Sequence, residues 1–159
     1  MMKIVEPSES QLETIKAILS YQFDSRVADA FIKKPLKISM RLGKIRYVYL
    51  EEKRIMTLRP TDFGFTLDIE SGKIVLENSE YPKYRVVVKE GVNYLGDVMG
   101  IDVIDADPSI KPGDEVVIIN NKGEIVGIGK ARVPGFMMKS IGKGEAVRIR
   151  KVLKNGQKS

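Results

Sequence analysis

The sequence contains no cysteine and no histidine among its 159 residues. Without cysteine the chain can form no disulfide, no thiol nucleophile and no thiolate metal ligand. Without histidine it lacks the commonest general base and a principal zinc ligand. Carboxylates and lysines could still support catalysis, but the missing residue types favour a binding protein over an enzyme. We therefore expect no catalytic residue, no metal and no cofactor.

Long hydrophobic runs are also missing. No apolar stretch approaches the roughly 20 residues that a membrane span needs, and the segment Met1–Pro7 lacks the apolar core of a signal peptide. Hydrophobic residues make up 43% of the chain, which is enough to form a folded core. We expect a cytoplasmic protein with no membrane partner, built as one large or two small domains.

The net charge of +6 is unevenly distributed along the chain. Residues 1–82 contain 13 basic and 12 acidic side chains, whereas residues 83–159 contain 14 and 9. From Lys139 to Lys158 there are seven basic residues and one acidic residue, Glu145. A basic domain with a basic final segment is typical of nucleic-acid binding. The alternative is a charged surface that only improves solubility.

The first half of the sequence predicts two helices followed by antiparallel strands. Ser8 or Ser10 can cap a helix that runs to about Phe23, and Asp24 can cap a second helix that ends before Pro35. Strands are predicted at residues 36–42, 45–50, 54–58, 63–69 and 74–77. This half should be an α+β layer, with helices on one face of an antiparallel sheet and the other face open.

The second half predicts short buried strands separated by glycine turns. They are expected at residues 85–88, from residue 98, and at 110–119, 124–133 and 144–153, with one or two helical turns after the first strand. The short polar segment Asn78–Pro82 interrupts the pattern between the halves. We therefore predict one domain at residues 1–81 and another at 82–159.

The order of elements in the second half resembles a PUA domain, a small RNA-binding β pseudobarrel. The segments Lys111-Pro-Gly-Asp-Glu-Val116 and Gly127-Ile-Gly-Lys-Ala131 carry most of this resemblance. The hairpin Gly43–Leu50 and the segment Leu58-Arg-Pro-Thr-Asp62 resemble the region that precedes the PUA domain in archaeal tRNA-guanine transglycosylases and archaeosine synthases. Phe63 is a departure, since that pattern has glycine directly after the aspartate.

The resemblance does not carry the transglycosylase reaction with it. In that family the reaction uses a (β/α)₈ barrel with aspartates and a zinc site. Such a barrel needs roughly 200 residues or more, and this sequence has no cysteine or histidine to hold zinc. The resemblance therefore implies an RNA-holding appendage.

In PUA domains RNA lies against the glycine-bearing segment after the first strand and against the closing strand. By position, this implies RNA contacts at Gly91, Asn93, Tyr94, Gly96, Asp97, Val98, Met99, Lys143, Arg148 and Arg150. Tyr94 can stack on a base, and the arginines can bind phosphates or base edges. The glycines allow a close approach of RNA to the backbone, although Gly96 could equally serve a tight turn.

A second basic group lies in the first half, where no acidic residue occurs between Asp29 and Glu51. In a strand over residues 36–42, Lys37, Ser39 and Arg41 share one face. Together with neighbouring cations, this face could contact a phosphate backbone, or it could consist only of solubilising lysines. Arg59 and Asp62 could also simply pair and fix their loop. The predicted secondary RNA contacts are Lys37, Arg41, Lys44, Arg46 and Arg59, beside Lys33 and Lys34.

These observations predict an RNA-binding protein that recognises tRNA at the acceptor stem and 3′ end. It would act as an accessory or targeting subunit in archaeosine-type tRNA modification, with a separate catalytic subunit as a candidate partner and without DNA as a ligand. One alternative is an rRNA-binding adaptor in ribosome assembly. A less favoured alternative is a small carboxylate-dependent enzyme using Asp62 with Arg59.

Overall fold

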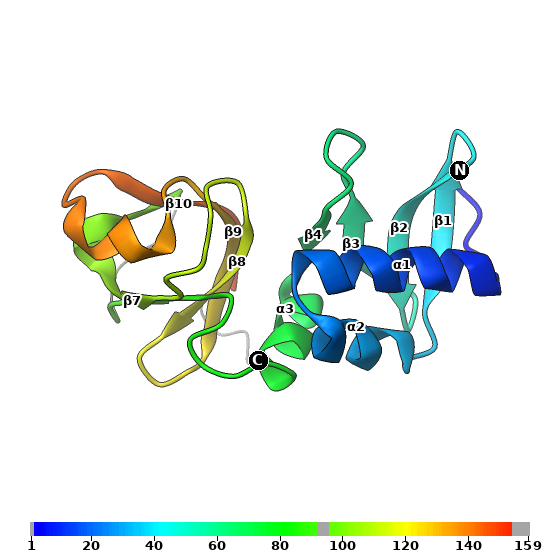
Figure 1. Ribbon diagram of the computed structural model, residues 1–159, viewed down its shortest axis with the longest axis horizontal. Coiled ribbons are helices and arrows are strands. Elements are labelled where there is room, and N and C mark those ends of the chain that lie inside the picture. Colours follow the sequence, from blue (N-terminus) through cyan, green and yellow to red (C-terminus); the bar gives the residue numbers. More distant parts are fainter. Residues whose placement is uncertain (1, 92–95, 154–159) are drawn as a thin grey trace. The chain divides into compact units, whose positions relative to one another are not determined.

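The structure is a computed structural model that describes residues 2–91 and 96–153. The chain forms two compact units, Met1–Ser79 and Glu80–Ser159 (Figure 1). The first unit packs helices on a four-stranded sheet, and the second is built around a curled six-stranded sheet. The predicted fold class, an α+β domain followed by a β pseudobarrel, is confirmed.

The first two helices, α1 (Glu9–Gln22) and α2 (Ser25–Ile32), begin at the predicted caps. The Ser8 hydroxyl accepts a hydrogen bond from the Gln11 amide at 3.1 Å, and the Gln11 side chain accepts one from the Ser8 amide at 2.8 Å. The Asp24 carboxylate caps α2 by accepting one hydrogen bond from the Val27 amide at 2.8 Å. These bonds satisfy amides that have no partner inside the helix.

The sheet of the first unit is antiparallel, with the strand order β1-β2-β3-β4. Its strands are β1 (Lys37–Arg41), β2 (Lys44–Leu50), β3 (Lys53–Leu58) and β4 (Phe65–Leu67). One row of directly opposed residues is fully or almost fully buried: Ile38, Val48, Met56 and Leu67. Because side chains alternate along a strand, the neighbouring rows face the opposite side of the sheet.

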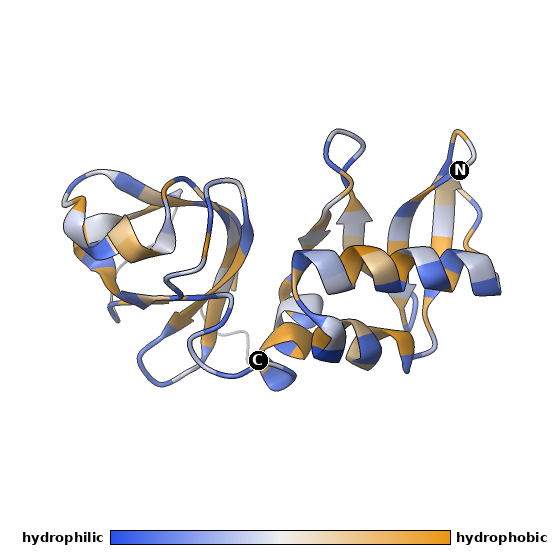
Figure 2. Ribbon diagram, in the orientation of Figure 1, coloured by the Kyte–Doolittle hydropathy of each residue, from blue (hydrophilic) through white to orange (hydrophobic). Residues whose placement is uncertain are grey.

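Figure 2 shows the hydrophobic residues that form this core, along α1 and α2 and on the strands of the sheet. From the helices, Ile15, Leu19 and Phe31 are fully buried. Burying side chains of this size stabilises the unit by roughly 1.5–3 kcal/mol each.

One predicted strand is wrong, because residues 74–77 belong to helix α3 (Ile69–Glu77). Asp68 caps this helix and the Ser71 hydroxyl completes the cap, at 2.9 Å from the Asp68 amide. The Ser71 hydroxyl also donates to the Ile55 carbonyl at 2.6 Å, which fixes the start of α3 to β3. A short apolar run fits either a strand or a buried helix, so periodicity alone misassigned this one.

The sheet of the second unit has the strand order β6-β10-β9-β8-β5-β7, and β5 runs parallel to β8. Its strands are β5 (Arg85–Val88), β6 (Asp97–Met99), β7 (Val103–Ala106), β8 (Glu115–Asn120), β9 (Ile125–Ala131) and β10 (Glu145–Val152). Two 3₁₀ helices, η1 (Gly100–Asp102) and η2 (Gly135–Ser140), pack beside them. The sequence did not predict β7 or η2. The helical turns expected after β5 involve residues 92–95, which lie outside the described residues.

Strands β9 and β10 approach each other closely because two residues of β9 have no side chain. A Cβ on Gly127 would lie 2.3 Å from the carbonyl oxygen of Lys151, and one on Gly129 would lie 2.6 Å from that of Arg148. Both distances are too short for any real side chain. The motif Gly127-Ile-Gly-Lys-Ala131 therefore sets the packing of the curled sheet.

The second unit includes Glu80 and Tyr81, which the sequence analysis assigned to the end of the first domain. The Tyr81 hydroxyl is hydrogen-bonded to Asp105, and this bond raises the pKa of Tyr81. The Arg85 guanidinium donates to the carbonyls of Lys83, at 2.7 Å, and Glu80, at 3.3 Å. Burial lowers the pKa of Arg85. The Tyr81–Asp105 bond and the local bonds of Arg85 together tie the segment from Glu80 onward to the second unit.

Gly135→Ala should destabilise the second unit, because the added Cβ would lie 1.8 Å from the carbonyl oxygen of Asp107. Overpacking of this kind typically costs about 1–3 kcal/mol or more. Gly96→Ala is a matched control, since an added Cβ there meets no atom of the described residues within 4 Å. Denaturant unfolding of both variants checks the prediction, and equal stability of Gly135→Ala and the parent would contradict it.

Candidate nucleic-acid interface

A polar row crosses the outer side of the second sheet. Arg148 on β10 lies directly opposite Lys130 on β9 and Asp97 on β6. Directly opposed residues project to the same side of a sheet. Arg148 and Lys130 are exposed and Asp97 is half-buried. The next row, Val98, Val147 and Ala131, is buried in the core, so the outer row is fixed by the packing beneath it.

Lys130 belongs to this row although the sequence analysis did not select it. The sequence shows Lys130 in the Gly-Ile-Gly-Lys-Ala segment. It does not show that Arg148 and Asp97 lie beside Lys130, because that depends on the register of β6, β9 and β10. A side-chain amine, a guanidinium and a carboxylate are thereby brought together. Arg148 and Lys130 can bind phosphates, and the Asp97 carboxylate can accept hydrogen bonds from a base amino group or a 2′-hydroxyl.

Arg150 has a different role from Arg148. Its guanidinium binds the Glu115 carboxylate through two hydrogen bonds, one of them, from Nη1 to Oε1, at 3.0 Å. The Glu115 side chain is fully buried, whereas that of Arg150 is 36% exposed. A buried carboxylate needs a partner. Arg150 therefore has a role in the fold, and its predicted RNA contact stays a prediction.

The remaining predicted contacts of the second unit divide into three groups. Val98 is fully buried in the core. Gly91, Gly96, Met99 and Lys143 are exposed. Asn93 and Tyr94 lie outside the described residues, so their role stays a prediction from the sequence.

Lys143 lies in the loop before β10, beside the start of η1. The Ile101 amide donates to the Gly142 carbonyl at 2.7 Å, and the Gly100 amide donates to the Gly144 carbonyl at 2.9 Å. These bonds fix the loop that carries Lys143 against the end of β6. The predicted glycine-bearing segment and the predicted final strand are therefore adjacent, as β6 and β10.

The predicted cations of the first unit do not form one continuous stripe. Lys37 and Arg41 are exposed near the two ends of β1, but Ser39 between them is fully buried. The Ser39 hydroxyl lies 2.9 Å from the Tyr49 hydroxyl. Lys44 is exposed at the hairpin that follows β1.

Arg46 occupies a β-bulge. Ser39 on β1 is paired with Tyr47 on β2, and the next residue, Met40, is paired with Ile45. Arg46 has no opposed residue on β1 and is therefore the additional residue of the bulge. A bulge changes the direction of the side chain that it carries. The Arg46 guanidinium consequently lies 6.0 Å from the centre of the Tyr47 ring.

An aromatic group that was not among the predicted contacts lies on the same sheet. The rings of Tyr47 and Tyr49 pack edge to face with centres 6.5 Å apart, and the Arg54 guanidinium lies 4.5 Å from the centre of the Tyr47 ring. The alternation of aromatic residues in 45–50 was a usable signal. Arg54 could not be assigned to the group without the register of β2 and β3.

Arg59 stabilises its own loop. Its Nε lies 2.8 Å from the Asp62 carboxylate, which also accepts a hydrogen bond from the Gly64 amide at 3.1 Å. A Cβ on Gly64 would lie 2.3 Å from the Arg59 guanidinium, so glycine makes room for this pair. The contacts support the loop-fixing alternative for Arg59 and Asp62.

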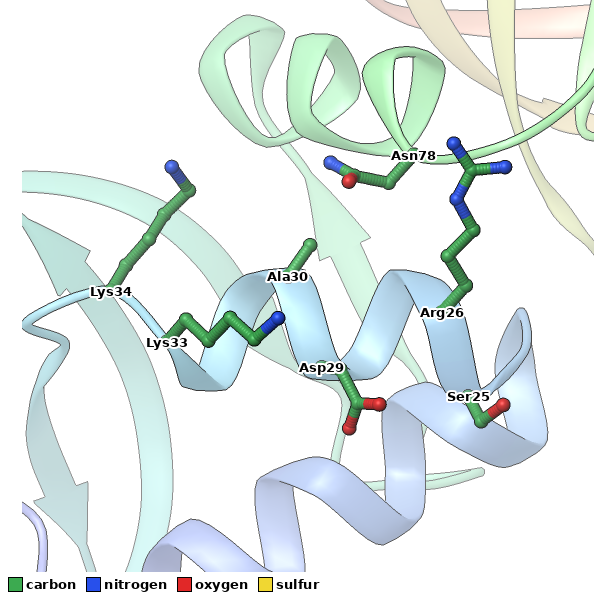
Figure 3. A pocket seen from close by; sticks show the side chains of 7 residues that line it. All are labelled: Ser25, Arg26, Asp29, Ala30, Lys33, Lys34 and Asn78. Carbon is green, nitrogen blue, oxygen red and sulfur yellow. The ribbon is translucent and has the colours of Figure 1, made fainter.

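An open pocket of about 690 Å³ lies along α2. Figure 3 shows Arg26, Asp29 and Lys33 on the helix and Asn78 at the end of α3. The Asp29 carboxylate lies 3.7 Å from the Lys16 ammonium. With Lys34 also in its lining, the pocket carries more cations than carboxylates and extends the basic character predicted for Lys33 and Lys34.

Residues 2–91 and 96–153 contain no group of three or more carboxylate, histidine or cysteine residues placed to hold a metal ion. Over the same residues, no helix combines the length and the apolar character that crossing a membrane requires.

Two family models match the chain in succession. Residues 13–82 match the patch-forming domain C2 of tRNA-guanine transglycosylase, and residues 84–153 match the PUA domain. The resemblance that the sequence analysis inferred from the Leu58–Asp62 segment and the glycine motif of β9 is thereby confirmed.

Curated relatives match over most of this chain. The tRNA-guanine(15) transglycosylase of Pyrococcus abyssi is 36% identical over 152 residues, which are 93% of this chain and 26% of the relative. That of Pyrococcus furiosus is 35% identical over 147 residues, 90% of this chain and 25% of the relative. The chain therefore spans about a quarter of the length of these relatives.

Two solved structures match nearly the whole of this chain. A hypothetical protein from Pyrococcus horikoshii has a TM-score of 0.75 at 24% identity, covering 97% of this chain and 96% of that one. A conserved PUA domain protein from Thermoplasma acidophilum has a TM-score of 0.69 at 16% identity, covering 98% and 95%. Likeness at these identities shows the fold.

Replacing the two arginines of β10 should separate folding from binding. Arg150→Ala leaves the buried Glu115 carboxylate without its guanidinium, and we expect a loss toward the lower end of the about 3–5 kcal/mol typical of a broken buried pair. Arg148→Ala removes the same charge from an exposed position and should change stability by less than about 0.5 kcal/mol. Thermal and denaturant unfolding measure both effects. Equal stability of the two variants would show that Arg150 has no structural role.

Proposed function

We propose that this PUA-domain protein, whose two units resemble part of the archaeal tRNA-guanine transglycosylases, binds structured RNA and that its RNA is tRNA. The observation that carries the proposal is the outer row of Arg148, Lys130 and Asp97 beside the glycine-bearing segment. A PUA domain is an RNA-binding fold, and the matched relatives are named for a reaction on tRNA.

The acceptor stem and the 3′ end of tRNA are the proposed target. The end of a tRNA combines a duplex with unpaired nucleotides, so it offers phosphates together with accessible base faces and edges. Arg148, Lys130 and Lys143 supply cations for the phosphates, while Asp97 and the exposed Met99 supply a polar and an apolar contact for bases. Tyr94 is the proposed stacking residue on sequence grounds.

In this proposal the chain supplies recognition, and a separate catalytic subunit supplies the chemistry of tRNA modification. The absence of histidine and cysteine supports such a division. The contacts between Arg59 and Asp62 hold their own loop, which supports a structural role for this pair. Ribosomal RNA is the alternative ligand, and competition between tRNA and ribosomal RNA fragments at equal salt would discriminate the two.

The affinity for tRNA should fall with salt because phosphate contacts release counterions. With about five contacts, the slope of log K against log[salt] should be about −3.5 to −4.5. Arg148→Ala and Lys130→Ala should each weaken binding and make the slope shallower by about 0.7–0.9. Titrations at several salt concentrations measure both quantities.

Lys73→Ala is the matched control for the loss of one positive charge, since the Lys73 ammonium already faces Glu70 at 3.8 Å. It should leave the slope unchanged. A tRNA affinity that is the same at low and physiological salt would refute the phosphate interface.

Trimming the tRNA tests the proposed 3′ end contact. Tyr94→Ala should weaken binding of intact tRNA by about 1–3 kcal/mol, the value of one stacked base, and should matter far less for tRNA that lacks its last nucleotides. If Arg148 holds a phosphate, Arg148→Ala should weaken the binding of both intact and trimmed tRNA. The affinities of the parent and of Tyr94→Ala for intact and for trimmed tRNA form a double-mutant cycle. A fold defect of the variant that lowers both affinities equally cancels in this cycle. Equal weakening of intact and trimmed tRNA by Tyr94→Ala would remove the 3′ end from this site.

A further inference from the structure

The open face of the first sheet carries aromatic and cationic side chains in two opposed rows. One row contains Lys37, Tyr49 and Arg54, and the other contains Ser39, Tyr47, Thr57 and Thr66. Neither row contains a carboxylate. The buried row between them faces the core under the helices, so these two rows lie on the other side of the sheet. Ser39 is itself fully buried on that side, so the accessible part of the face lies over the remaining residues of the two rows.

The aromatic rings on this face are held in defined positions. The Tyr49 hydroxyl is fixed by Ser39 at 2.9 Å, and its ring packs against the ring of Tyr47. The Arg54 guanidinium lies over the Tyr47 ring at 4.5 Å from its centre. Tyr47 and Tyr49 are half-buried and Arg54 is exposed. A planar guanidinium that lies over a tyrosine ring turns its other face outward. This outer face is flat and positively charged, so another planar group can stack on it.

Arg46 adds a second guanidinium beside the same ring. The bulge in β2 brings its guanidinium to 6.0 Å from the centre of the Tyr47 ring. Its Nε is inaccessible to solvent and has no hydrogen-bond partner among the described residues. An unsatisfied buried donor of this kind is costly. Because this Nε is out of reach of solvent, Arg46 would have to bind a ligand through the outer nitrogens of its guanidinium.

From this arrangement we propose that the open face of the first sheet binds unpaired RNA bases by stacking. Tyr47 and Arg54 form the stacking surface, Tyr49 supports it, and Arg46 and Lys37 bind the adjacent phosphates or base edges. The ligand class is a single-stranded RNA segment, because bases inside a duplex have their faces covered by neighbouring bases. Aromatic side chains on an open sheet, flanked by arginines, are a general means of holding such segments.

This inference rests on the proposed function, since it names a second type of RNA contact within the same chain. It differs in its location and in its chemistry. The outer row of the second sheet contacts phosphates through exposed cations, whereas the first sheet contacts base faces through rings and guanidinium planes. The two contacts can therefore fail independently.

The experiment uses the full chain with two fluorescent RNAs of equal length, an unstructured single strand and a blunt duplex, at one salt concentration. Tyr47→Leu should weaken binding of the single strand by about 5- to 150-fold, the effect of about 1–3 kcal/mol for one stacked base. Duplex affinity should change by less than twofold. Tyr47→Phe keeps the ring and should restore most of the single-strand affinity that Tyr47→Leu loses.

Arg54→Lys distinguishes stacking from a purely electrostatic role of Arg54, in which the affinity for single-stranded RNA would not change. It keeps the positive charge but replaces a planar group by a compact ammonium. Single-strand affinity should fall while the salt slope stays the same. Lys53→Ala is the charge control on the same strand, since Lys53 lies outside the two rows, and it should have little effect. Unfolding midpoints of all variants identify any change that is due to the fold.

Three outcomes would overturn the inference. Tyr47→Leu could weaken the binding of the single strand and of the duplex equally, or it could leave both affinities unchanged. It could also change the sedimentation mass of the chain and not its RNA affinity, which would identify a contact between copies. In each case Arg148→Ala is measured with tRNA in parallel. If Arg148→Ala still weakens tRNA binding, only the stacking surface is refuted. If the parent binds no RNA of any kind, the proposed function fails with it.

Discussion

The close approach of β9 to β10 is the constraint on which the proposed phosphate interface depends. Gly127 and Gly129 leave space that is filled by the carbonyl oxygens of Lys151 and Arg148. Any side chain at these positions would separate the strands and disturb the register that places Arg148 opposite Lys130. The cationic surface therefore depends on two residues that contribute no charge and no side chain of their own.

The sequence predicted best the features that are determined by neighbours in the chain. The caps at Ser8 and Asp24 follow from hydrogen bonds that span three residues, and the strand Arg85–Val88 follows from a short apolar segment between turn signals. Helix α3 was misassigned because Ile74 and Val75 are buried in a run too short to show its period. The cap at Asp68 distinguishes this helix from a strand, and the prediction of a strand did not take this local signal into account.

The features that the sequence could not predict depend on register. Arg150 and Glu115 are 35 residues apart, and only the pairing of β8, β9 and β10 brings them together. In the sequence, Arg148 and Arg150 are equivalent basic residues two positions apart, although one is exposed and the other neutralises a buried carboxylate. The bulge at Arg46 is similar, because one additional residue in β2 moves a side chain that strict alternation would place elsewhere.

The two proposed contacts respond to different properties of an RNA. Phosphate contacts at the second sheet are indifferent to sequence and weaken as salt rises. Stacking at the first sheet requires unpaired bases, and it depends on salt only through the accompanying cations. A chain with only the first kind of contact would bind any duplex, and a chain with only the second would bind any single strand. An RNA that presents a duplex together with an unpaired segment offers a ligand for each of the two proposed contacts, and two linked contacts bind more tightly than either one alone. In this proposal, selectivity for a structured RNA such as tRNA comes mainly from the combination of phosphate contacts and stacking, with the base-edge contacts of residues such as Asp97 added to it.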